Sequence, residues 1–111
     1  MDTRSLAAGE LAPFLSRLES EFHPELVLLF GSRARGDFHG DSDYDLVIVS
    51  EKFAGMKWRD RVARLLKLWD RYDLVDLMPY TRAEFESKKK DFVSVQTAVK
   101  ESIQLLPRTI H

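Results

Sequence analysis

The sequence contains no cysteine, which excludes disulfides and thiolate chemistry and fits a reducing cytoplasm. It also has no excess charge of either sign, since the formal net charge at pH 7 is −1. Without an overall positive field, nucleic acid is not expected as a partner. No apolar run approaches the ~20 residues that a membrane span needs, and no signal-peptide pattern opens the chain. The sequence therefore predicts a cytoplasmic protein with no membrane association.

The composition is that of an ordinary globular protein. The 111 residues are 44% hydrophobic and 32% charged. A chain of this length fits one domain. No repeat or linker divides it, so we expect a single domain over residues 1–111.

Apolar periodicity predicts alternating helices and strands. A first helix should begin near residues 10–12 and end at His23-Pro24. The capping-box pattern Thr81-Arg82-Ala83-Glu84 should open a later helix. The other predicted elements are strands over 25–30, 44–50, 74–80 and 102–106, a helical turn over 32–35, a loop over 36–42 and an amphipathic helix over 56–72. This alternation predicts an α/β (α+β) fold with helices packed on one sheet.

The sharpest motif lies between the first two predicted strands. Gly31-Ser32 is followed by ten residues and then by Asp43-Tyr44-Asp45. Asp43 and Asp45 are two residues apart, so in a strand they point to the same face. Carboxylate oxygens are ligands that Mg²⁺ prefers, usually alongside phosphate oxygens. Ser32 opens a helical turn whose exposed N–H groups favour an anion. The arrangement suits a nucleoside triphosphate with its metal ions.

Two other nucleotide-binding motifs are excluded. Gly31 and Gly36 have the spacing of a P-loop, but Asp37-Phe38 stands where that loop needs Lys followed by Ser or Thr. The Gly-x-Gly-x-x-Gly of dinucleotide-binding folds does not occur in the chain.

The segments 29–36 and 42–46 together resemble the nucleotidyltransferase superfamily, which includes the DNA polymerase β type of palm. That superfamily's signature is Gly-Ser, a spacer, Asp-x-Asp and a third carboxylate on a later strand. The chain looks most like the minimal nucleotidyltransferase (MNT) group, small antitoxin-like proteins that partner HEPN-domain proteins. This resemblance implies the nucleotidyltransferase fold, with a small mixed central sheet packed with helices.

The third carboxylate has two candidates. The resemblance matches its strand to Val75-Asp76-Leu77, which favours Asp76. Asp76 should lie within the strand, where a buried unpaired carboxylate would be costly and a metal site would explain it. The residues alone leave Asp73, at the edge of the strand, as the alternative.

The resemblance also implies roles for the site residues. Asp43 and Asp45 would bridge two Mg²⁺ ions, for which Mn²⁺ could substitute, and the third carboxylate would complete the metal on the side of the nucleophile. Gly31 would allow close approach to phosphate, Ser32 would add a hydroxyl donor, and Arg35 would face the phosphates. We expect Arg33 at the surface or facing a partner, and Trp58 and Trp69 in the core or a protein contact.

The expected activity is transfer of AMP from ATP to a hydroxyl acceptor, with release of pyrophosphate. Little chain remains for an acceptor-binding domain, so the acceptor should be presented by another macromolecule. In the MNT group the resemblance implies a tyrosine of a HEPN toxin, with this chain as the antitoxin in a hetero-oligomer. The alternatives are a non-catalytic antitoxin that neutralises its partner by contact, and a subunit that transfers nucleotides to small molecules or RNA.

Overall fold

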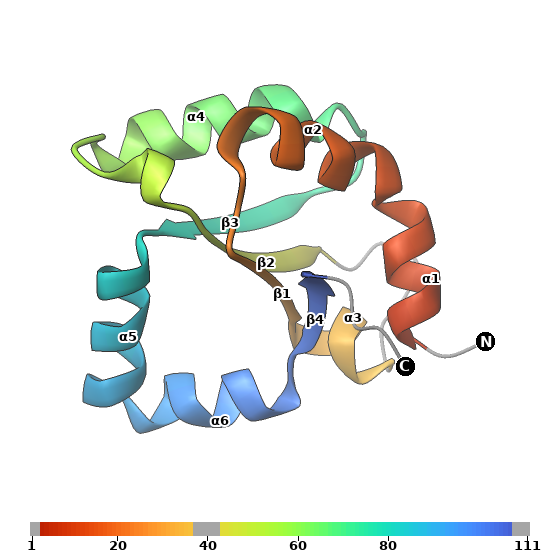
Figure 1. Cartoon of the computed structure of the whole chain (residues 1–111). Helices are drawn as coiled ribbons and strands as arrows, with labels where there is room; N and C mark the ends of the chain where they lie inside the picture. Colours follow the sequence, from red (N-terminus) through yellow and green to blue (C-terminus); the bar gives the residue numbers. More distant parts are fainter. Residues whose placement is uncertain (1–2, 37–42, 108–111) are drawn as a thin grey trace.

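The computed structural model describes residues 3–36 and 43–107, which are arranged around a four-stranded sheet (Figure 1). The strands, in the spatial order β3-β2-β1-β4, are β1 (Leu26–Phe30), β2 (Tyr44–Val49), β3 (Val75–Tyr80) and β4 (Ile103–Leu106). β1 pairs antiparallel with both β2 and β4, whereas β2 and β3 run parallel. The predicted small mixed sheet packed with helices is therefore confirmed.

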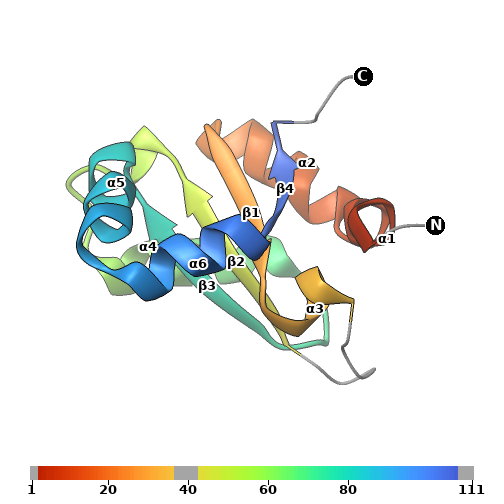
Figure 2. The ribbon, with the colours of Figure 1, turned by 90° about the horizontal axis from the view of Figure 1, so that it is seen from below.

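Helices cover both faces of the sheet (Figures 1 and 2). α1 (Thr3–Glu10), α2 (Ala12–Phe22) and α4 (Trp58–Trp69) pack on one face, while α5 (Arg82–Asp91) and α6 (Val93–Glu101) lie on the other. Because side chains alternate along a strand, β2 contributes Leu46 and Ile48 to the larger core and Val47 and Val49 to the smaller one. β2 is the predicted central strand, apolar on both faces.

The predicted helix signals act where the sequence places them. Pro13 lies in the first turn of α2, where its missing N–H costs nothing. At the start of α5, Thr81 Oγ1 accepts a hydrogen bond from the Glu84 amide, and the Glu84 carboxylate accepts one from the Thr81 amide. The predicted capping box is confirmed.

Two helix predictions were wrong. The sequence reading missed α1, which contributes Ala7 to the core. The helix expected over 56–72 is shorter, because Asp70 adopts a left-handed backbone with φ 42° and ends α4. Tyr72 therefore lies beyond the helix with 99% of its surface exposed. Trp58, the first residue of α4, is 46% exposed, so of its two expected roles the protein contact stays a prediction, whereas Trp69 lies in the core as expected.

The connections between strands determine where the site lies. Parallel pairing of β2 and β3 requires a crossover, and the short 3₁₀ helix η1 (Glu51–Phe53) and α4 supply it. The amino ends of both strands consequently meet at one end of the sheet, beside α3 (Gly31–Arg35), as Figure 2 shows. Apart from Gly36, the loop predicted over 36–42 falls outside the described residues. Among residues 3–36 and 43–107, every helix is too short or too polar to cross a bilayer.

Candidate active site

Three carboxylates lie at the amino ends of β2 and β3. Asp45 and Asp76 are the second residues of these strands and are paired with each other in the parallel register. Paired residues of neighbouring strands present their side chains on the same face. Asp43 immediately precedes β2, and its charge acts on Asp45 as that of Asp76 does. Asp43 and Asp76 are exposed, while Asp45 is half-buried. The fold thus gathers charges that the sequence separates.

The electrostatics of this cluster favour a cation. The pKa of Asp45 is raised, first by burial and then by the negative charges of Asp76 and Asp43. None of the ion pairs between described residues involves these three carboxylates. Oxygen donors of this kind suit Mg²⁺. In the described part of the chain, however, no three His, Cys, Asp or Glu side chains are already placed to hold a metal ion together. The donor chemistry fits the metal, and ligation by these residues stays a prediction.

The structure separates Asp73 from this cluster. The Arg71 guanidinium donates to both carboxylate oxygens of Asp73, at 2.8 and 2.6 Å. This hydrogen bonding from Arg71 is the main reason that the pKa of Asp73 is lowered. Asp76 lies within β3 as expected, but its side chain is exposed, so the expectation of a buried carboxylate was wrong. β3 is an edge strand of the sheet, and its first two residues are less buried than Leu77 and Pro79 further along it.

The residues predicted to bind phosphate lie on α3, next to the carboxylates. Gly31 opens the helix with a left-handed φ of 74°. A Cβ placed on Gly31 would collide with the carboxylate of Asp45, so this glycine makes room for an acid as well as for any phosphate. Ser32 is the second residue of α3 and Arg35 the last, with an exposed side chain.

Sequence reasoning missed a polar network beneath the carboxylates. Arg33, expected at the surface, is only 7% exposed and lies over the Tyr44 ring, 4.2 Å from its centroid. The Tyr44 hydroxyl donates to the carboxylate of Glu10 and accepts from Arg33 Nη1 at 3.2 Å. Burial, followed by the hydrogen bond to Glu10, raises the pKa of Tyr44 to about 12. The network links α1, α3 and the start of β2. Its central residue, Tyr44, stands between the two aspartates of the motif.

A signal for this network was present in the motif. Tyr44 stands between Asp43 and Asp45, so strand alternation sends its ring to the opposite face. A buried tyrosine hydroxyl needs a polar partner. Nearby charged residues such as Arg33 were therefore candidates for the interior.

These features coincide with a family match. The model of the nucleotidyltransferase domain family matches residues 10–104, a span that includes α3 and all three carboxylates. The chain belongs to this family, and its general role is that of a nucleotidyltransferase. No curated protein matches the chain.

Solved structures share the fold at low sequence identity. A candidate nucleotidyltransferase from Sulfolobus solfataricus is 24% identical, with a TM-score of 0.60 over 94% of this chain and 86% of that one. The BolA domain of SufE1 from Arabidopsis thaliana is 21% identical, with a TM-score of 0.52 over 68% of this chain and 94% of that one. A toxin-antitoxin structure with AMP-PNP is 21% identical, with a TM-score of 0.47 over 86% of this chain and 73% of that one. The first two similarities concern the fold alone, and the third is too weak to support an inference.

Proposed function

We propose that this nucleotidyltransferase transfers AMP from ATP to a hydroxyl group of a partner protein, with two Mg²⁺ ions as cofactors and Mn²⁺ as a possible substitute. The observation that carries the proposal is the pairing of Asp45 with Asp76 in the parallel register, with the charge of Asp43 acting on Asp45, in a chain that belongs to the nucleotidyltransferase family.

The site residues divide the work between metal and phosphate. Asp43, Asp45 and Asp76 would hold the cations, and Gly31, Ser32 and Arg35 would contact the triphosphate from α3. When bound, two such ions neutralise phosphate charge and lower the pKa of the attacking hydroxyl. The acceptor oxygen forms a bond to the α-phosphorus, and the bond from that phosphorus to the bridging oxygen breaks. Pyrophosphate leaves, and the hydroxyl proton passes to water.

A protein acceptor is supported by exposed side chains near the site. Leu66, Tyr72 and Leu74 are 49%, 99% and 67% exposed and line a shallow hollow around residues 69–75, the segment that leads into β3. Exposed apolar groups that gather in this way often mark protein contacts. The resemblance to the MNT group suggests a HEPN-domain toxin as the partner and a tyrosine as the acceptor. We propose that the two proteins form a cytoplasmic toxin-antitoxin pair.

The same exposed hollow would also serve a second candidate function. An antitoxin that neutralises its partner by contact needs this surface but neither nucleotide nor carboxylates. The two candidates therefore differ in whether nucleotide binding and transfer occur at all.

ATP labelled at the α-phosphate, incubated with the chain, Mg²⁺ and a HEPN-domain protein, tests the proposal. The label should move to a tyrosine of that protein, and Asp45→Asn should abolish the transfer while the two proteins still bind. Thermal melts provide the second arm, because a ligand that binds only the folded state stabilises it. Mg²⁺ with ATP should raise the melting temperature of the wild type but not of Asp45→Asn. A wild type that stays unlabelled, melts unchanged with nucleotide and still binds its partner would favour the contact-only function.

A further inference from the structure

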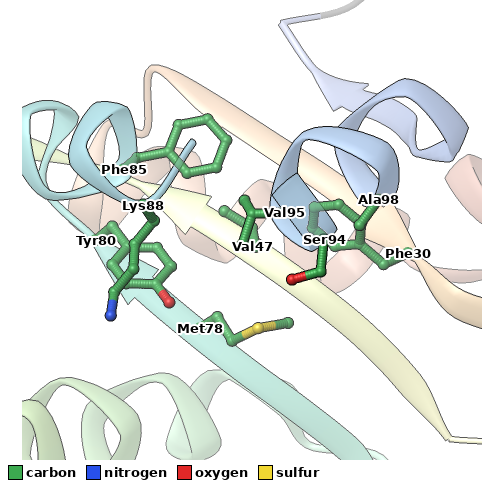
Figure 3. Close-up of a pocket in the computed structure, with 9 residues that line it drawn as sticks. All are labelled: Phe30, Val47, Met78, Tyr80, Phe85, Lys88, Ser94, Val95 and Ala98. Atoms are coloured by element: carbon green, nitrogen blue, oxygen red, sulfur yellow. The ribbon is translucent and has the colours of Figure 1, made fainter. Parts of the chain in front are cut away.

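A pocket of about 170 Å³ lies between the sheet and the two C-terminal helices (Figure 3). Its floor consists of side chains from three neighbouring strands, and α5 and α6 form its walls. The lining is mostly apolar, with polar atoms contributed by Tyr80, Lys88 and Ser94 (Figure 3). Residues of the floor are Phe30, Val47, Met78 and Tyr80.

The pocket shares its sheet face with the carboxylates. Val47 follows Asp45 by two residues on β2, and Met78 follows Asp76 by two residues on β3, so both pairs point to the same side. Phe30, on β1, is paired with Asp45 in the antiparallel register. The pocket therefore reaches the level of Asp45 at Phe30, while Val47 and Met78 lie roughly 7 Å along their strands from the carboxylates, at a rise of about 3.3 Å per residue.

The pKa of Tyr80, at the other end of the pocket, also indicates that the pocket lies near the carboxylates. The pKa of the Tyr80 hydroxyl is raised by burial and by the charges of Glu84 and Asp76. A side chain of the pocket therefore senses one of the carboxylates of the site.

We propose that this pocket binds the base of the nucleoside triphosphate, an inference that rests on the proposed function. Its size admits one heteroaromatic ring system but not a whole nucleotide, since an apolar cavity of about 150 Å³ already binds benzene. The apolar floor suits the faces of a base, and the hydroxyls of Tyr80 and Ser94 suit its polar edge. A base over Val47 and Met78 would leave room for a ribose between the base and the α-phosphate.

A bulky residue at the mouth of the pocket provides the test. Ser94 is exposed and lines the pocket, so Ser94→Phe fills it without disturbing packed core residues. Thr97, also exposed on α6 but outside the lining, provides the matched control Thr97→Phe. The probes are ATP and inorganic tripolyphosphate, which lacks a base, each titrated with Mg²⁺ by calorimetry. Equal melting temperatures would show that both variants fold, and Ala98→Leu replaces Ser94→Phe if the latter melts early.

The wild type should bind ATP more tightly than tripolyphosphate. Ser94→Phe should weaken ATP binding about tenfold or more, in keeping with the loss of base contacts, and should leave tripolyphosphate binding unchanged. Thr97→Phe should alter neither affinity. If folded Ser94→Phe binds ATP as tightly as the wild type does, the pocket does not bind the base, and the proposed function still stands. This conclusion holds even if the variant no longer binds a protein partner. A wild type that binds neither probe would overturn both.

Discussion

Gly31 and Asp45 fit together so closely that only a residue without a side chain at position 31 leaves room for the carboxylate. A Cβ on Gly31 would overlap Asp45 Oδ2, and the φ of 74° at Gly31 independently disfavours any other residue. The glycine of the motif therefore determines where one of its aspartates can point.

Gly31→Ala should abolish nucleotidyl transfer and lower the melting temperature, because the added methyl group displaces the Asp45 carboxylate. Gly55→Ala is the matched control, since Gly55 has a similar φ of 81° but open space around its Cα. That control should lower the melting temperature by backbone strain alone and retain transfer. Wild-type transfer rates in Gly31→Ala would show that Asp45 need not hold its position.

Neutralising single carboxylates should separate function from stability. Asp43→Asn, Asp45→Asn and Asp76→Asn should each remove transfer, and Asp45→Asn should slightly raise the melting temperature in the absence of metal by relieving repulsion. Asp73→Asn should do the reverse, with transfer nearly intact and a lower melting temperature, because it weakens the ion pair with Arg71. Transfer assays and melts on the four variants check this. If Asp73→Asn removed transfer and Asp76→Asn did not, Asp73 rather than Asp76 would be the third carboxylate.

Tyr44→Phe should destabilise the fold by about 1–3 kcal/mol, because it removes a hydroxyl that partners buried Arg33 and the carboxylate of Glu10. Transfer should also fall, since Tyr44 anchors the backbone between Asp43 and Asp45. Denaturant unfolding and the transfer assay measure the two effects. Tyr72→Phe, which removes a hydroxyl from a fully exposed ring, should leave the free energy of unfolding unchanged.

Glu84→Gln should destabilise the protein at neutral pH, with a difference from the wild type that disappears in acid. The buried Arg61 guanidinium donates to both oxygens of Glu84, at 2.6 and 3.1 Å, and this lowers the pKa of Glu84 from 4.5 to about 2. A lowered pKa means that the carboxylate stabilises the fold above pH 4.5 and that this contribution is lost as the pH falls toward 2. Melts of both proteins between these limits measure the convergence. If the difference in melting temperature between the two proteins did not change with pH, the charge of Glu84 would not be its cause. Glu19→Gln is the control, because it removes the charge of an exposed carboxylate.

Much of the fold could be predicted from local sequence signals, and the predictions that were wrong failed for physical reasons. Strand positions, the start of α2 and the capping box at Thr81 depend on neighbouring residues and were predicted. The end of α4 depends on the left-handed backbone of Asp70, and no glycine marks it. α1 has a weakly apolar sequence and contributes to the core through Ala7, which a periodicity argument cannot detect.

The site divides in the same way. Asp43 and Asp45 are close because they are near in the sequence, whereas the proximity of Asp76 to Asp45 depends on the register of β2 and β3, which the sequence does not reveal. The choice of Asp76 came from a family resemblance, and the Arg71–Asp73 ion pair then supplied the physical reason why Asp73 is occupied elsewhere. The burial of Arg33 depends on contacts between α1, α3 and β2, which only the folded chain shows.

Pro79 and Arg61 together block one position on the outer edge of β3, the strand that carries Asp76. β3 has β2 on one side only, and an edge strand with free backbone groups invites another chain to add to the sheet. Pro79 has no N–H to offer, and its carbonyl already accepts a hydrogen bond from Arg61 Nη1 at 3.1 Å. A foreign strand therefore finds neither donor nor free acceptor at this position. The edge of β3 is thereby protected from edge-to-edge aggregation at this position, although Asp76 on the same strand is exposed.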